Sequence, residues 1–377
     1  MMVCRNATFN LSLNEVCATM RLNSLTVPLG LLLIVTPLTA ANPQEATENG
    51  PRGIVVNPYT DMVYAITASS GTVTAINGVT NAVTAIKVGS GAKALAINPV
   101  TNRVYVINSD SGTMSVIDGT KNTVTATVDV GALPSVIALN PVTNKIYVAR
   151  SYGNGYITVV DGATNIPKSI KVDVEANAIA VNTTTDKIYL VGYEDQSVTV
   201  VDGTTNLAGR LPTGTHLWEI AVDAVSNKVY LPNSGDASVT VIDAQDNATT
   251  TVAAGKIPCA VALNDQTNVA YVLNYGSDSV TVMDAARNSV IATIPTGRRP
   301  QSIAVNPKTN RIYVANTHSH NVTIIDGKTN SVAAVVEAGA GPYSIAVNAV
   351  TNKVYVANRL SNKVTVIDGR TNRSMQL

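Results

Sequence analysis

Short apolar runs alternate with turn residues along nearly the whole chain after residue 50. One stretch shows the order in full, with strands expected at 302–305, 312–315, 322–325 and 332–336 and turns at 306–310 and 326–330. Asn, Asp and Gly fill the turns because they close tight turns and tolerate positive φ. The first strand is apolar on both faces, which indicates an inner strand packed on two sides. The fourth strand of the units is more polar, which is typical of an outer edge.

The same pattern recurs about every 41 residues. A tyrosine within an apolar run marks each unit, at Tyr64, Tyr105, Tyr147, Tyr189, Tyr230, Tyr271, Tyr313 and Tyr355. An Asn or Asp stands seven residues before each tyrosine, from Asn57 in the first unit to Asn348 in the last. Four antiparallel strands in a repeat of this length form one β-propeller blade. The sequence therefore predicts an all-β fold, a single propeller of eight four-stranded blades over 53–377. Seven blades with a detached hairpin are the alternative.

The repeat resembles a known family. The motif is clearest in two segments, Tyr313-Val314-Ala315-Asn316 and Ile325-Asp326-Gly327-Lys328-Thr329-Asn330. These segments closely resemble the YVTN repeat of the YncE-like β-propellers. The resemblance covers 53–377 and all of the units. It implies a secreted or surface propeller with a binding role. Related propeller families include lactonases and lyases, so the resemblance leaves an enzyme as an alternative.

The chain before the repeats has the pattern of an export signal. An apolar run at 25–41 follows Arg21 and ends in small residues, a pattern typical of a secretory signal peptide cleaved after Ala40. The run is bracketed by prolines and too short for a membrane span. We therefore assign 1–19 to an upstream extension, 20–40 to a signal peptide and 41–52 to a lead-in. The expected location is secreted or periplasmic, with no lipid anchor and no transmembrane helix.

The last unit ends early, at Leu377, and its fourth strand looks incomplete. Repeat register aligns Pro43–Thr47 with the end of a fourth strand. We therefore expect residues 43–48 of the mature N-terminus to pair with Val364–Ile367 and complete the last blade.

Composition supports a folded domain and limits the possible partners. Hydrophobic residues make up 45% of the chain and charged residues 14%, which excludes a disordered protein. The net charge of +1 gives no electrostatic reason to expect nucleic acid. Cys259 is the one cysteine that follows the signal peptide, so no internal disulfide can form, and we interpret this residue as inert. The sequence has no haem-attachment motif and no Gly-rich phosphate loop, and no cofactor is expected.

Functional residues are expected where the repeats differ from one another. The recurring Asn and Asp turns define one face, and we assign them to turn closure. On the opposite, variable face, the position five before each turn Asn or Asp differs in every unit: Arg52, Lys93, Ser135, Asn177, Trp218, Cys259, Gln301 and Tyr343. The candidate ligand-binding set on this face is Trp218, Tyr343, Arg299, Lys93, His216, Arg52, Arg298 and Glu219. We expect these loop residues to ring the channel mouth, exposed enough that substitutions barely change folding.

Charges on the variable face are separated by sign. The acidic residues are Glu175, Glu194, Asp195 and Glu219, and the basic residues are Arg298, Arg299, Arg359, Arg52, Lys93 and Arg150. This separation favours an anionic or zwitterionic ligand, with ordinary solvated loop charge as the alternative. The expected partner is an unidentified small molecule, saccharide or protein, bound by a monomer.

Metal and catalytic chemistry have weaker support in the sequence. His318 and His320 have the spacing of two metal ligands, but no nearby carboxylate or thiol completes a site, and we expect no metal. His216 and Glu219 could serve acid–base chemistry in a lactonase- or lyase-like enzyme. No nucleophile, base and orienting group stand together, so no catalytic residue is assigned. The leading hypothesis is an exported, non-catalytic binding module.

Overall fold

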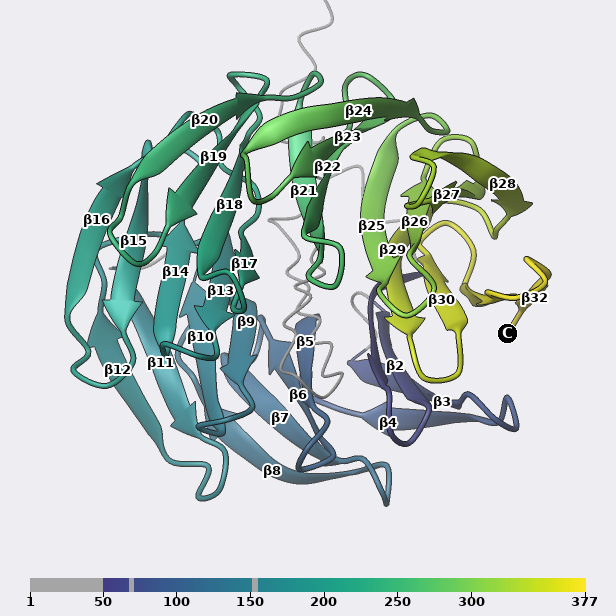
Figure 1. Ribbon diagram of the computed structural model, residues 1–377. Helices are drawn as coiled ribbons and strands as arrows, with labels where there is room; N and C mark the ends of the chain where they lie inside the picture. Colours follow the sequence, from purple (N-terminus) through teal and green to yellow (C-terminus); the bar gives the residue numbers. More distant parts are fainter. Residues whose placement is uncertain (1–49, 68–70, 151–154) are drawn as a thin grey trace, which may run out of the picture.

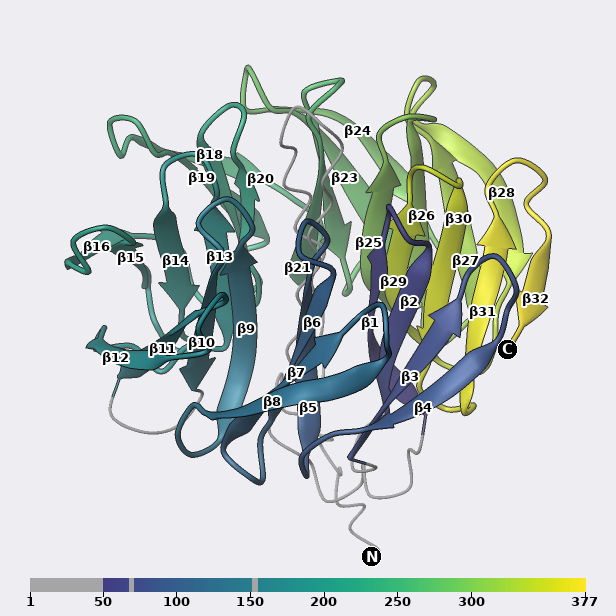
Figure 2. The same cartoon turned by 90° about the horizontal axis from the view of Figure 1, so that it is seen from below.

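The protein is an eight-bladed β-propeller in the computed structural model, which describes residues 50–67, 71–150 and 155–377. The strands of this part form separate four-stranded antiparallel sheets arranged in a ring (Figure 1, Figure 2). The predicted fold class and blade count are confirmed, and the seven-blade alternative is wrong. Within the described ranges, no helix is long and apolar enough to cross a membrane. The extension, the signal peptide and most of the lead-in lie outside these ranges.

Each blade uses four consecutive strands. Blade 1 consists of β1 (Pro51–Asn57), β2 (Met62–Thr67), β3 (Thr72–Asn77) and β4 (Val83–Lys87). Blade 2 consists of β5 (Ala92–Asn98), β6 (Arg103–Asn108), β7 (Thr113–Asp118) and β8 (Thr123–Asp129). Blade 3 consists of β9 (Pro134–Asn140), β10 (Lys145–Arg150), β11 (Tyr156–Asp161) and β12 (Pro167–Lys171). Blade 4 consists of β13 (Ala178–Asn182), β14 (Lys187–Val191), β15 (Ser197–Asp202) and β16 (Ala208–Pro212).

The second half of the ring repeats this order. Blade 5 consists of β17 (Ala221–Asp223), β18 (Lys228–Asn233), β19 (Ser238–Asp243) and β20 (Thr249–Ala253). Blade 6 consists of β21 (Pro258–Asn264), β22 (Val269–Asn274), β23 (Ser279–Asp284) and β24 (Ser289–Pro295). Blade 7 consists of β25 (Pro300–Asn306), β26 (Arg311–Asn316), β27 (Asn321–Asp326) and β28 (Ser331–Glu337). Blade 8 consists of β29 (Pro342–Asn348), β30 (Lys353–Asn358), β31 (Lys363–Asp368) and β32 (Ser374–Gln376).

The core lies between neighbouring blades. First strands such as β25 and β29 are buried at every position, and they contact the first strands of adjacent blades. The repeated tyrosines are the largest fully buried side chains. Burial raises the pKa of Tyr64 to about 12, with a smaller contribution from Asp118. Fourth strands alternate instead, as in β8, because one face meets solvent.

The turn face is joined by side-chain amides, a feature that the sequence analysis did not anticipate. The Asn that opens the inner turn accepts backbone N–H groups of its own turn, as Asn98 does from Val100 at 3.0 Å. Its Nδ2 donates to the turn of the next blade at 2.6–2.9 Å in seven pairs: Asn57–Asn102, Asn98–Asn144, Asn140–Asp186, Asn182–Asn227, Asn264–Asn310, Asn306–Asn352 and Asn348–Asp61. The recurring residues thus close turns and also connect blades.

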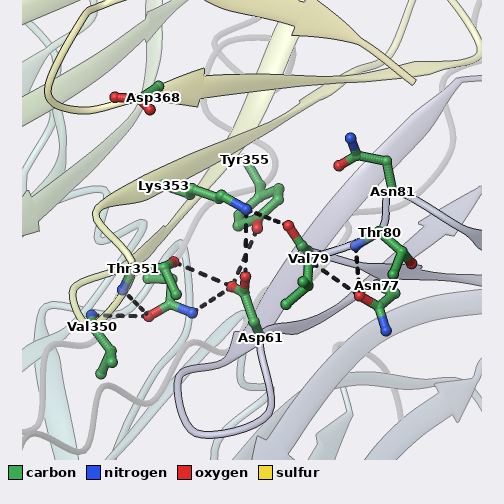
Figure 3. A network of polar contacts seen from close by, with 12 residues as sticks. Asp61, Asn77, Val79, Thr80, Asn81, Val350, Thr351, Lys353, Tyr355 and Asp368 are labelled. Carbon is green, nitrogen blue, oxygen red and sulfur yellow. Dashed lines mark hydrogen bonds and ion pairs between the residues drawn. The ribbon is translucent and has the colours of Figure 1, made fainter.

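Blade 8 meets blade 1 through a denser version of this contact (Figure 3). Asp61 has a positive φ of 53° and is 5% exposed. Its Oδ1 accepts from Asn348 Nδ2 at 2.6 Å, and its Oδ2 lies 3.6 Å from Lys353 Nζ. The hydroxyls of Thr351 and Tyr355 donate to the same Oδ1, each at 3.3 Å. Lys353 Nζ also donates to the Gly78 carbonyl.

The fourth strand of blade 8 comes from the C-terminus, so the prediction that residues 43–48 supply it is wrong. Strand β32 pairs with Thr365–Ile367, while β30 occupies the other edge of β31. Leu377 and Val364 add two backbone hydrogen bonds at 2.9 and 3.1 Å. The chain returns to β31 because the turn after Asp368 closes as in other blades. In this turn the Asn372 backbone N–H donates to the Asp368 carbonyl at 2.8 Å. Residues 43–48 themselves lie outside the described ranges.

Candidate functional site

The variable positions share one structural location, the start of each blade's first strand. In six blades the pairing register skips one residue there: Arg52, Lys93, Ser135, Cys259, Gln301 and Tyr343. In blades 4 and 5 the equivalent residues, Asn177 and Trp218, stand before β13 and β17. A β-bulge leaves one residue outside the hydrogen-bonded ladder and changes the direction of its side chain. The residue at this position can therefore differ from blade to blade without disturbing strand pairing.

Several candidate residues are more buried than the sequence suggested. Trp218 is 8% exposed, Tyr343 2%, Arg52 4% and Glu219 1%. The expectation that these loops are exposed is wrong for these four residues. First strands of neighbouring blades contact one another, as β25 contacts β29, and a single repeat does not reveal these contacts.

An aromatic cluster lies over blades 4 to 6. The ring of Tyr193 is 4.6 Å from the Trp218 ring and 5.0 Å from the His216 ring. Trp218 belongs to one hydrophobic cluster with Cys259 and Tyr275. Its indole Nε1 is buried, with no hydrogen-bond acceptor among the residues that the structure describes. The Cys259 thiol is therefore part of apolar packing.

A cationic cluster, consisting of Arg298, Arg299, His318 and Arg359, continues the site over blades 7 and 8. The Arg299 guanidinium lies 4.6 Å from the centre of the Tyr275 ring, and the Arg359 guanidinium lies 4.7 Å from that of Tyr343. Both contacts are cation–π stacks. Two arginines of different loops are thus held on two aromatic rings.

Backbone hydrogen bonds hold the cationic loops together. Thr317 and His318 donate their N–H groups to the carbonyls of Arg299 and Arg298, at 3.0 and 3.2 Å. The Arg299 N–H donates to Asp278 Oδ1 at 2.8 Å. The Thr317 hydroxyl donates to the Pro342 carbonyl at 2.7 Å, so the loop of blade 7 is tied to blade 8. The cluster is therefore built on connected loops.

The surroundings of His318 disfavour the protonated form of its imidazole. Desolvation by the surrounding loops and then the positive charges of Arg299, Arg359, Arg298 and His320 hold the pKa of His318 below its usual value. Near neutral pH the fixed charge of the cluster therefore comes from its arginines.

A family profile for YNCE-like β-propellers matches residues 62–376. The chain belongs to the YncE-like β-propeller family. This finding agrees with the family suggested by the repeat. No curated protein matches the sequence.

Solved structures similar to this YncE-like propeller include enzymes. Hydrazine synthase of Kuenenia stuttgartiensis shares 20% identity over 88% of this chain and 98% of its own, with a TM-score of 0.60. Dihydro-heme d1 dehydrogenase NirN, solved in complex with DHE, shares 14% identity over 96% of this chain and 78% of its own, with a TM-score of 0.69. At these identities the likeness shows the fold alone.

The propeller brings some candidate residues together and separates others. The rings of Trp218 and His216 both contact the Tyr193 ring. The charges of Arg298 and Arg299 act on His318. The Arg359 guanidinium stacks on the Tyr343 ring. Lys93 stands apart in blade 2, where burial lowers its pKa to about 8 against the opposing charge of Asp110. The candidate set omitted Tyr193, Tyr275 and Arg359. Their position in the variable loops between second and third strands was the available signal.

Two members of the charge pattern have structural partners. Arg150 Nη2 donates to the Val130 carbonyl at 3.0 Å and to Thr158 Oγ1 at 3.3 Å. Asp195 forms an ion pair with Arg210 at 3.4 Å. Over the described part of the chain, no three His, Cys, Asp or Glu residues are grouped to hold a metal ion.

Proposed function

We propose that this YncE-like propeller is an exported, non-catalytic binding module for an organic anion, which it captures at the cationic cluster. The observation that carries the proposal is the pair of arginines stacked on aromatic rings at 4.6 and 4.7 Å. Stacking on Tyr275 holds the Arg299 guanidinium so that it loses part of its rotational freedom in advance, while its planar fork of N–H donors can still meet a ligand. Carboxylates match that fork bidentately, so the arrangement suits acids better than neutral ligands.

Local charge balance supports the same proposal. No carboxylate of the described residues lies within ion-pair distance of the Arg298 or Arg299 side chain. The Asp278 carboxylate accepts a hydrogen bond from the Arg299 backbone N–H at 2.8 Å and forms no ion pair with the Arg299 guanidinium. Adjacent positive charges attract an external anion and raise its local concentration. In the neighbouring aromatic cluster, Tyr193 and His216 are half-buried and offer contact for the body of the ligand.

Calorimetric titration with a panel of organic acids tests the proposal. Arg299→Ala should weaken binding by about 1–3 kcal/mol, since it removes a charged hydrogen-bonding partner. Arg287→Ala is the matched control, because Arg287 is an exposed arginine on the turn face that pairs with Asp284 at 2.6 Å. An acid that binds equally well to both variants would refute the assignment to the cationic cluster. Turnover of a bound lactone would refute the non-catalytic part.

Export is part of the proposal and rests on the N-terminal sequence pattern. Mass spectrometry of the protein recovered from the periplasm or medium should give a mature chain that starts at Ala41. A full-length chain retained in the cytoplasm would contradict export. We also propose that the mature propeller is a monomer, which light scattering can test.

A further inference from the structure

The cationic cluster combines fixed charges with one group that can gain a charge. Arg298 and Arg299 are adjacent in the loop between β24 and β25, and neither side chain has an ion-pair partner among the described residues. Their mutual repulsion is offset best by a ligand that carries two negative charges. A monoanion would neutralise one guanidinium and leave the positive charge of the other uncompensated.

His318 lies among these charges. Backbone hydrogen bonds at 3.0 and 3.2 Å join the loop of Thr317 and His318 to the loop of Arg298 and Arg299. The charges that act on the imidazole come from these two arginines, from Arg359 in the loop of blade 8 and from His320 in its own loop. His320 is engaged separately, because its Nδ1 accepts the Gly341 N–H at 3.0 Å. Desolvation and the positive charges of these groups therefore oppose protonation of His318 in the free protein. Asp278, whose Oδ1 accepts the Arg299 backbone N–H at 2.8 Å, is the acidic group that contacts the same loop. The histidine is exposed, so protons and ligands can reach it.

We infer that the ligand is a dianion, such as a dicarboxylate or another divalent oxyanion, and that His318 takes up a proton as this ligand binds. This inference rests on the proposed function. A bound dianion offsets the positive charges of the arginines and accepts a hydrogen bond from the new N–H group. These two gains act against the desolvation that is the first cause opposing the imidazolium. The proton comes from solvent and ends on the imidazole. By linkage, uptake of a proton on binding means that affinity rises as the pH falls.

Calorimetry on the full-length chain tests both parts of the inference. The probes are acetate, succinate and sulfate, titrated at about pH 7 in two buffers with different ionisation enthalpies. Sulfate keeps its charge near this pH, so any proton exchange in its titration comes from the protein or the buffer. Succinate or sulfate should bind about tenfold or more tightly than acetate. The buffer dependence of the enthalpy should give uptake of between about half a proton and one proton per ligand.

Two variants assign the proton. His318→Gln keeps a polar side chain at an exposed position and should bind the dianion with little or no proton uptake. His320→Gln is the control and should retain the uptake. Unchanged uptake in His318→Gln, or equal affinity for acetate and succinate, would overturn this inference while leaving anion binding in place. Absence of binding by all three probes, or binding unaffected by Arg299→Ala, would overturn the proposed function as well.

Discussion

Closure of the ring at Asp61 gives a sharp test of how the propeller is held together. Blades 1 and 8 are the first and last blades, so no chain segment runs from one repeat to the next at this junction. Asp61→Ala removes the acceptor of Asn348 at 2.6 Å and the hydroxyl contacts of Thr351 and Tyr355 at 3.3 Å. It also leaves Lys353 without the carboxylate 3.6 Å away.

The expected loss is large because the carboxylate is 5% exposed. Breaking a buried charged network costs about 3–5 kcal/mol of unfolding free energy. Alanine at the positive φ of 53° adds about 1–2 kcal/mol of backbone strain. Asp61→Asn keeps an oxygen acceptor, as at Asn102 and Asn144, so it should cost only about 1–2 kcal/mol.

The matched control is Asn102→Ala, between blades 1 and 2. Asn102 accepts from Asn57 at 2.7 Å and has a φ of 52°, so the backbone strain of the two alanine variants cancels in the comparison. Urea unfolding monitored by circular dichroism should show Asp61→Ala losing about 2–3 kcal/mol more than Asn102→Ala. Equal losses would refute the argument that the Asp61 network does more than an ordinary contact between blades.

Three further predictions follow from burial and strand pairing. Trp218→Ala should lower the unfolding free energy by about 3–5 kcal/mol because the indole is 8% exposed, whereas Arg299→Ala should change it by less than about 1 kcal/mol in the same urea assay. Burial raises the pKa of Tyr189 and Tyr271 to about 12, above the value of about 10 in the unfolded chain. The free energy of unfolding should therefore be constant below about pH 10 and fall as the pH rises toward 12. Tyrosine absorbance and circular dichroism, recorded together, measure this loss. Deleting residues 374–377 should speed amide hydrogen exchange of β31, because its outer edge loses β32; unchanged exchange would contradict that pairing.

The sequence predicted the architecture because each repeat fixes it independently. The tyrosine and the Asn or Asp seven residues before it both recur every 41 or 42 residues, so one misread unit could not change the blade count. The repeat pattern did not predict the fourth strand of blade 8. A strand of three residues, Ser374–Gln376, has too little pattern to be recognised in the sequence, and its pairing with β31 became visible in the structure alone.

Contacts between blades limited the prediction of the site. Tyr193, Trp218 and Tyr275 come from three blades, and their approach depends on the angle between neighbouring sheets. The length of the repeat does not determine that angle. The burial of Glu219 and Tyr343, which are 1% and 2% exposed, is not visible in the repeat either. The guanidinium of Arg359, from a different loop, lies over the Tyr343 ring.

The two faces differ in how strongly the fold constrains their side chains. On the turn face, Asn306 bonds its own turn at 3.1 Å and the next blade at 2.7 Å, so a substitution there loses two contacts of the scaffold. On the variable face, Gln301 and Tyr343 occupy bulges whose backbones lie outside the ladder, so strand pairing places no demand on their side chains. A ring with such bulges in six of its blades can change its ligand chemistry without changing its fold. This is why a test of function belongs at Arg299 and His318, whereas a test of stability belongs at Asp61.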